Sequence, residues 1–309
     1  MKNTFGKLLV GASMAIGMGA LAANPAQAGT LTGATIGGTA ASDYYVYGVS
    51  GNNTVKINNP TTTDLKNALT GDATSPTGNV ELRATSEQVG FDFSKNTTLS
   101  GKIGGKDIIL SSLTASDWNS IYKPGKTFGQ YWFDSALTAN GFGSLVGSTI
   151  GTGFFNVFAN NGGFQRFSDP NISYVNQNDT TGLISIGLAG HLNATPLLLP
   201  YFTQYVNSLP NSPLKATANN LKNLLAVTPT QASEIIKYTY NGVTDYKFSF
   251  TATNSGLVSN DGTNSHNGNY EVTIDGVPPT TVPEPSVMLG LFGVAGIVAA
   301  QRKLKKVSV

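Results

Sequence analysis

Residues 234–250, EIIKYTYNGVTDYKFSF, indicate the fold of this chain more directly than any other stretch of its sequence. Ile, Tyr and Phe alternate with polar residues on both sides of Asn241-Gly242. Alternation with a period of two is typical of a half-buried β-strand, and Asn-Gly between such runs is a strong signal for a hairpin turn. The stretch therefore predicts two antiparallel strands joined by a tight turn.

Two registers are possible for this hairpin. A two-residue Asn-Gly loop would place Lys237 opposite Tyr246, and so an apolar side chain opposite a charged one. A three-residue loop, residues 240–242 with the glycine left-handed, would place Ile236 opposite Tyr246 and Lys237 opposite Asp245. Because cross-strand pairs of like character stabilise a sheet, we expect the second register.

Runs with a similar composition occur toward both ends of the chain and, at two places, between the helical segments of its middle. Aromatic and β-branched residues are enriched in strands, and Gly and Asn clusters separate such runs as turns do. Gly104-Gly105 is a further two-residue hairpin turn by this reasoning. The predicted strands are residues 44–49, 80–84, 88–93, 97–103, 106–111, 172–175, 183–188 and 270–274.

The middle of the chain, residues 115–227, has helical signals. Thr114 can cap a short helix that ends before Pro124-Gly125, and residues 130–139 and 197–209 are further candidates, the second interrupted or kinked by Pro200. Apolar residues then recur at helical spacing and predict a helix with one buried face. These residues are Leu214, Ala218, Leu221, Leu224 and Leu225. The expected fold class is α+β and mainly β, an antiparallel sheet or sandwich-like body with a helical middle section.

The N-terminus has the features of a secretory signal. Lys2 and Lys7 are basic, residues 8–23 are uncharged and apolar, and Ala26-Gln27-Ala28 supplies the small-x-small pattern that signal peptidase accepts. Residues 1–28 are therefore predicted to be a signal helix that is cut after Ala28.

A second apolar run, residues 287–300, lies near the C-terminus. At about 1.5 Å per residue these 14 residues span about 21 Å, which is short for a hydrocarbon core about 30 Å thick. Basic residues that follow an apolar run stay on the cytoplasmic side and act as a stop-transfer signal. These residues are Arg302, Lys303, Lys305 and Lys306. The sequence predicts a transmembrane helix and basic tail at residues 286–309.

Pro283, Glu284 and Pro285 precede this run, and two prolines keep such a segment extended. The three parts in this order, on a chain with a signal peptide, closely resemble the PEP-CTERM sorting signal of certain bacteria. The resemblance covers about a tenth of the chain, and the body is also similar to cyanobacterial members of that group. It implies that an exosortase-type membrane protease recognises the three residues and discards the chain from Val287 onward. An ordinary stalk before a single-pass helix is the alternative.

This organisation gives four parts: the signal peptide 1–28, an exported globular body 29–276, a Pro-rich linker with the PEP motif 277–285, and the sorting segment 286–309. Six of the 19 basic residues lie in the terminal signals. The remainder of the chain has 13 basic and 17 acidic residues, a net charge of −4. A nucleic-acid partner is not expected, because binding phosphates needs clustered Lys and Arg.

The body carries no recognisable catalytic motif. It has no cysteine, and its two histidines, His191 and His266, lack metal-ligand spacing and are expected to be structural. Residues 147–153 are glycine-rich, but no Gly-Lys-Ser/Thr follows, so they do not predict a phosphate loop. No cofactor, metal or enzymatic activity is expected. A secreted hydrolase stays open as an alternative, because a glycosidase needs only two carboxylates about 5 to 10 Å apart in a cleft.

A carbohydrate- or calcium-binding adhesion module is the other alternative. Residues 131–133 (Tyr-Trp-Phe) and 164–167 (Phe-Gln-Arg-Phe) could stack on sugars if exposed, although core packing is favoured. A loop near the end of the body is rich in oxygen ligands of the kind that calcium uses, although an ordinary polar loop is favoured. These residues are Asp261, Asn264, Ser265, Asn267, Asn269 and Glu271.

The function expected from these observations is that of a non-enzymatic exported protein. After a transient stay at the membrane it would reach the cell envelope, the cell surface or the extracellular matrix. Its expected partners are signal peptidase and the secretion machinery, the exosortase-type protease, and exopolysaccharide.

Overall fold

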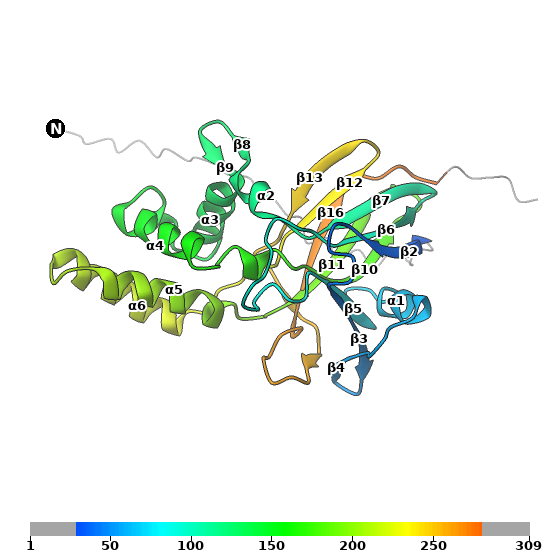
Figure 1. Cartoon of the computed structure of the whole chain (residues 1–309), viewed down its shortest axis with the longest axis horizontal. Coiled ribbons are helices and arrows are strands. Elements are labelled where there is room, and N and C mark those ends of the chain that lie inside the picture. The colour runs from blue at the N-terminus through cyan, green and yellow to red at the C-terminus, as the bar shows by residue number, and fades with distance from the viewer. Residues whose placement is uncertain (1–28, 280–309) are drawn as a thin grey trace, which may run out of the picture.

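The structure, a computed structural model, describes residues 29–279. The fold class is α+β with mostly β structure, as the sequence predicted. A large sheet has the strand order β14-β16-β11-β10-β5-β3-β4-β15, with β1 paired to β10 (Figure 1). Its strands are β1 (Gly29–Thr30), β3 (Tyr44–Ser50), β4 (Asn53–Lys56), β5 (Gly78–Leu82), β10 (Asn171–Gln177), β11 (Ile184–Gly190), β14 (Thr253–Asn254), β15 (Val258–Ser259) and β16 (Gly268–Ile274).

The large sheet is curled into a half-barrel. Its two edge strands, β14 and β15, come from one short segment, residues 253–259, so this segment connects the two edges. All neighbouring strands are antiparallel except β15 and β4, which are parallel.

A second sheet has the order β13-β12-β7-β6-β2 and packs against one face of the large sheet. Its strands are β2 (Thr32–Gly37), β6 (Thr98–Ile103), β7 (Lys106–Ser111), β12 (Ile236–Tyr240) and β13 (Val243–Lys247), and a separate pair consists of β8 (Ile121–Lys123) and β9 (Lys126–Thr127). Aliphatic side chains fill the space between the sheets; Val80 and Ile186 from the large sheet and Leu110 from the smaller one are fully buried there.

Most of the helices form a helical layer beside the two sheets, on the left in Figure 1. They are α2 (Ala115–Asn119), α3 (Phe128–Ala139), α4 (Thr149–Asn160), α5 (Thr195–Ser208) and α6 (Pro213–Val227); α1 (Thr62–Ala68) instead packs against the sheets. The helical layer has its own aromatic core, in which Trp118 stacks on Phe164 with ring centroids 4.2 Å apart. No helix within residues 29–279 is long and apolar enough to span a bilayer.

Several predicted elements are confirmed and some are wrong. Strand β7 and the Gly104-Gly105 turn match the prediction, as do helices α2 and α3 within two residues at each end. Helix α5 runs through Pro200 without interruption. On α6, Ala218 and Leu225 are buried as predicted, whereas Leu224, which was also predicted to be buried, is 51% exposed.

The strand predicted at residues 88–93 is wrong. This segment is a series of turns, in which the Ser86 amide donates to the carbonyl of Arg83 and the Gln88 amide to that of Thr85. Arg83 has a φ of +60°, which ends β5 and turns the chain away from the sheet. The prediction also missed α1 and α4. Both have capping signals, Thr61 and Ser148, whose hydroxyls accept backbone amides.

The hairpin register that we preferred is also wrong. Strands β12 and β13 pair Lys237 with Tyr246 and Tyr240 with Val243, which leaves a two-residue loop. Asn241 and Gly242 have φ values of +48° and +79°, the left-handed pair that a type I′ turn requires. The charge of Lys237 is satisfied outside the hairpin, because its ammonium lies 2.7 Å from Asp117 of α2. Turn geometry therefore set the register, and a third element supplied the charge partner.

Candidate functional site

The face of the large sheet that points away from the second sheet is polar. In β5, Val80 and Leu82 enter the core between the sheets, so Asn79 and Glu81 point to the opposite face. Register places Tyr47 beside Asn79 and Asn171 beside Glu81. We call this surface the polar face; Tyr47, Asn79, Glu81, Asn171 and Asn269 belong to it.

Asn79 is the least satisfied residue of the polar face. It is 1% exposed, and neither its amide nitrogen nor its amide oxygen has a hydrogen-bond partner among residues 29–279. Asn171 is better placed, because its amide nitrogen contacts the Glu234 carboxylate, although its Oδ1 has no partner there either. A buried amide without partners is destabilising by about 1 to 3 kcal/mol, so this face carries polar groups that its own packing does not satisfy.

Three carboxyl groups gather at one end of the polar face: Glu81 of β5, Asp169 just before β10, and Glu234 just before β12. Glu81 accepts a hydrogen bond from the Tyr47 hydroxyl at 3.0 Å, and Ser86 donates to Asp169 at 2.5 Å. Glu234 accepts the backbone amide of Asn171 at 2.7 Å. We call these three residues the carboxyl cluster.

Burial and mutual repulsion keep protons on this cluster. Burial, followed by the charge of Asp169, raises the pKa of Glu81 to about 8. Burial raises the pKa of Asp169 to about 7, against the hydrogen bond from Ser86, which lowers it. Burial and then the charges of Asp169 and Glu81 raise the pKa of Glu234 well above its ordinary value. Such carboxyl groups hold protons near neutral pH and can donate hydrogen bonds or protons.

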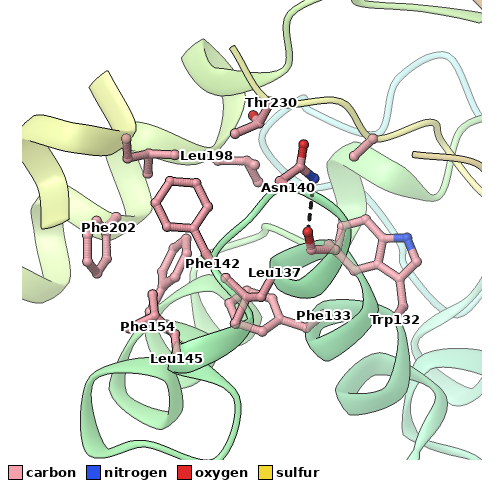
Figure 2. A pocket seen from close by; sticks show the side chains of 13 residues that line it. Trp132, Phe133, Leu137, Asn140, Phe142, Leu145, Phe154, Leu198, Phe202 and Thr230 are labelled. Atoms are coloured by element: carbon pink, nitrogen blue, oxygen red, sulfur yellow. Dashed lines mark hydrogen bonds between the residues drawn. The ribbon is translucent and has the colours of Figure 1, made fainter. Parts of the chain in front are cut away.

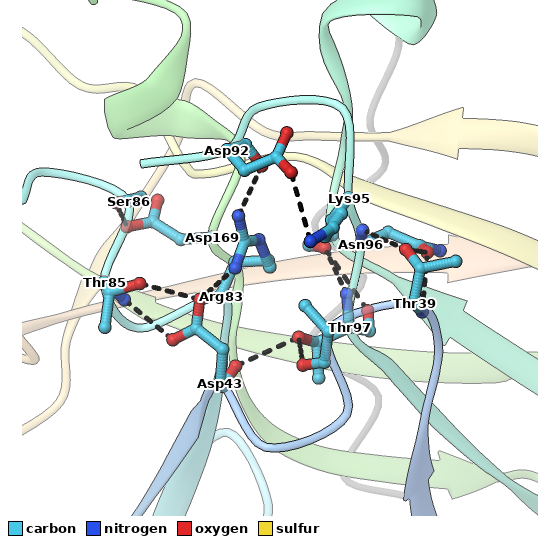
Figure 3. A network of polar contacts seen from close by, with 12 residues as sticks. Thr39, Asp43, Arg83, Thr85, Ser86, Asp92, Lys95, Asn96, Thr97 and Asp169 are labelled. Carbon is cyan, nitrogen blue, oxygen red and sulfur yellow. Dashed lines mark hydrogen bonds and ion pairs between the residues drawn. The ribbon is translucent and has the colours of Figure 1, made fainter. Parts of the chain in front are cut away.

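Beside the cluster, a polar network joins the two sheets (Figure 3). Arg83, which follows β5, forms an ion pair with Asp43, which precedes β3, and also donates to the carbonyl of Asp92 at 2.5 Å. Thr97, which precedes β6 of the second sheet, donates its hydroxyl to the Asp43 carbonyl at 3.0 Å. Arg83 is 5% exposed, so the ion pair compensates a cation inside the protein. The role of this network is structural.

Of the two histidines, His266 is buried against a side-chain partner, whereas His191 is half-buried. His266 is 4% exposed, its Nδ1 lies 2.7 Å from the Thr54 hydroxyl, and burial lowers its pKa to about 4. His191 follows β11, and burial followed by the charge of Arg166 lowers its pKa.

The oxygen-rich loop uses its own side chains to hold its shape. One oxygen of Asp261 accepts both the backbone amide and the hydroxyl of Thr263, and Asn267 accepts the backbone amide of Leu192 at 2.6 Å. Asn269 and Glu271 belong to β16, where Glu271 accepts the Tyr174 hydroxyl. In the described part of the chain, no three His, Cys, Asp or Glu side chains have the arrangement of a metal site. Asn264 and Ser265 complete the loop, which is an ordinary polar turn region.

The predicted sugar-stacking aromatics are core residues. Trp132, Phe133 and Phe167 are at most 3% exposed, and Phe164 is 8% exposed. Only Tyr131 is partly exposed, and its ring packs against Tyr122 at 5.1 Å. These two segments therefore offer no stacking surface.

An apolar pocket lies inside the helical layer, between α3, α4, α5 and α6 (Figure 2). Phe133, Phe142, Phe154 and Phe202 line it, and the amide of Asn140 stands at its rim. Its volume is about 30 Å³, which is the space of one or two water molecules, and its walls offer almost no polar partner for them. The pocket is a packing defect of the aromatic core.

Comparison with models of known families, with curated proteins and with solved structures finds no match to this chain. The residues predicted for processing and sorting lie outside the described residues: Ala26 and Ala28, Pro283, Glu284 and Pro285, and Arg302, Lys303, Lys305 and Lys306. Sequence reasoning missed the carboxyl cluster, because its members lie more than 60 residues apart and meet only through strand pairing. The alternation of polar Asn79 and Glu81 with apolar Val80 and Leu82 was the available signal.

Proposed function

We propose that this chain is a non-enzymatic exported protein that an exosortase-type protease sorts to the cell envelope, the cell surface or the extracellular matrix. Signal peptidase and the secretion machinery act on residues 1–28. Residues 286–309 hold the chain in the membrane until the protease reads Pro283, Glu284 and Pro285. Exopolysaccharide is the matrix partner that the sorting resemblance supports.

The observation that carries this proposal is that the two ends of the body meet. Gly29, the residue after the proposed signal peptidase cut, pairs with Gln177. The side chain of the same Gln177 donates to the carbonyl of Val277, the first residue of the linker, at 2.8 Å. Both ends therefore leave the body at the turn between β10 and β11.

This arrangement suits a protein with a membrane segment at each end. During export both apolar segments must reach one bilayer, and ends that leave the body at one corner reach it without a long linker. Removal of either segment also leaves every strand and helix of residues 29–276 in place, because β1 begins at Gly29 and β16 ends at Ile274. Chain ends of this kind tolerate processing.

Fractionation of an exosortase-containing host tests the proposal. We expect the wild-type body at the cell surface or in the medium, and Glu284→Ala retained in the membrane fraction. Asp275→Ala is the matched control, because it removes an exposed acid near the linker but outside the motif. If Glu284→Ala and wild type distribute identically, the sorting function is wrong.

A further inference from the structure

The turn between β10 and β11 contains a carboxylate oxygen that the described residues leave unpaired. Asp179 Oδ1 is buried and has no hydrogen-bond partner among residues 29–279. The turn that carries it is rigid: the Asn178 side chain accepts the backbone amides of Thr180 and Thr181, each at 3.0 Å. The Gly182 amide closes the turn onto the carbonyl of Asn178 at 2.7 Å. These hydrogen bonds fix the backbone of the turn from which the Asp179 side chain projects.

Gly29 lies against this oxygen. A Cβ atom built on Gly29 would be 3.0 Å from Asp179 Oδ1. Because the backbone nitrogen and Cβ are bonded to the same Cα, the Gly29 nitrogen lies no more than about 5.5 Å from that oxygen. Pairing of β1 with β10 keeps Gly29 in this position.

Cleavage after Ala28 would change the chemistry of this nitrogen. In the precursor it is a neutral peptide amide with one hydrogen. In the cleaved chain it is an ammonium group with three donors and a positive charge. Once the preceding peptide bond is cut, rotation about the Cα–C bond of Gly29 can carry the free nitrogen toward the position of that Cβ atom, within reach of the carboxylate. A carboxylate is the kind of partner that a desolvated ammonium group requires.

We propose that signal peptidase cleavage creates an ion pair between the Gly29 ammonium and the Asp179 carboxylate, which locks β1 onto the body only in the mature protein. The inference rests on the proposed export function, because it needs a cut after Ala28. It supplies a partner for the Asp179 oxygen that residues 29–279 leave unpaired. It also gives the first residue a role, because glycine has no Cβ atom and so leaves room for the carboxylate.

The test uses exported wild-type protein, Asp179→Asn, and the control Glu271→Gln, which removes an exposed acid from β16. Intact mass first establishes the N-terminal residue of each protein. The α-amine is then labelled at pH 7 with a limiting amount of amine reagent, and the rate is read from the N-terminal peptide. A free α-amino group has a pKa near 7.7 to 8.0, and an ion pair that raises it by about half a unit to one unit slows labelling about 3- to 10-fold.

We expect wild type and Glu271→Gln to react about 3- to 10-fold more slowly than Asp179→Asn. Equal rates in proteins that begin at Gly29 overturn the ion pair and leave the export function intact. A first residue other than Gly29 overturns the cleavage site as well. If Asp179→Asn does not fold, wild type unfolded in urea is the reference, and a folded protein that labels as fast as this reference contradicts the ion pair.

Discussion

The carboxyl cluster makes the stability of the body depend on pH in a direction opposite to that of most acidic groups. A carboxyl group whose pKa is higher in the folded than in the unfolded state binds more protons when folded. Between the two pKa values unfolding then releases protons, so the free energy of unfolding falls as the pH rises. For Glu81 this window runs from about 4.5 to about 8.

The magnitude follows from the size of the shift. One pKa unit corresponds to about 1.4 kcal/mol, so the shift of Glu81 is equivalent to a loss of at most about 4 kcal/mol between pH 4.5 and pH 8. Glu81 keeps some contact with solvent, so we expect about half of this value. Glu81→Gln is a neutral isostere whose amide oxygen can still accept the hydrogen bond from the Tyr47 hydroxyl. Because glutamine does not ionise, the variant should not lose this stability as the pH rises.

Urea titrations at pH 5, 6.5 and 8 measure the effect. We expect Glu81→Gln to be close to wild type at pH 5 and more stable by about 2 kcal/mol at pH 8. Glu271→Gln is the matched control, since Glu271 also accepts a tyrosine hydroxyl but is exposed. A stability difference between wild type and Glu81→Gln that does not change from pH 5 to pH 8 would refute the reasoning.

Three further predictions concern stability and are checked by urea titration at pH 6. Arg83→Met leaves the Asp43 carboxylate buried without its cation and should lower the free energy of unfolding by about 3 to 5 kcal/mol; a loss below 1 kcal/mol would mean that the pair is not buried. Trp118→Ala removes a fully buried ring whose indole donates to Ser168 at 2.7 Å, and should lower the free energy of unfolding by about 3 to 5 kcal/mol. Gly242→Ala should lower it by about 1 kcal/mol, because alanine is strained at a φ of +79°; no change would argue against the two-residue turn.

Local features of the fold were predictable from the sequence, and long-range pairing was not. Strand β7 and the Gly104-Gly105 turn depend on neighbouring residues, and the prediction matched both. The predicted register of the hairpin at Asn241-Gly242 was wrong, because the partner of the Lys237 charge lies outside the hairpin. Lys237 and Tyr246 in fact both reach Asp117, more than 100 residues earlier.

The carboxyl cluster could not be predicted from the sequence for the same reason, because it depends on long-range pairing. Glu81, Asp169 and Glu234 come from three separate parts of the chain, and no local spacing relates them. What unites them is that β5 pairs with β10 and that the backbone amide of Asn171 donates to Glu234. The aromatic segments were easier to interpret, because a run such as Tyr131-Trp132-Phe133 on a helix is ordinarily core, and two of its three side chains are buried.

The most direct test of the central claim is the intact mass of the protein recovered from outside the cytoplasm of an exosortase-containing host. The account predicts a single chain that begins at Gly29 and ends before Val287, so that both terminal segments are gone. A recovered chain that still carries residues 1–28 and 287–309 would contradict it.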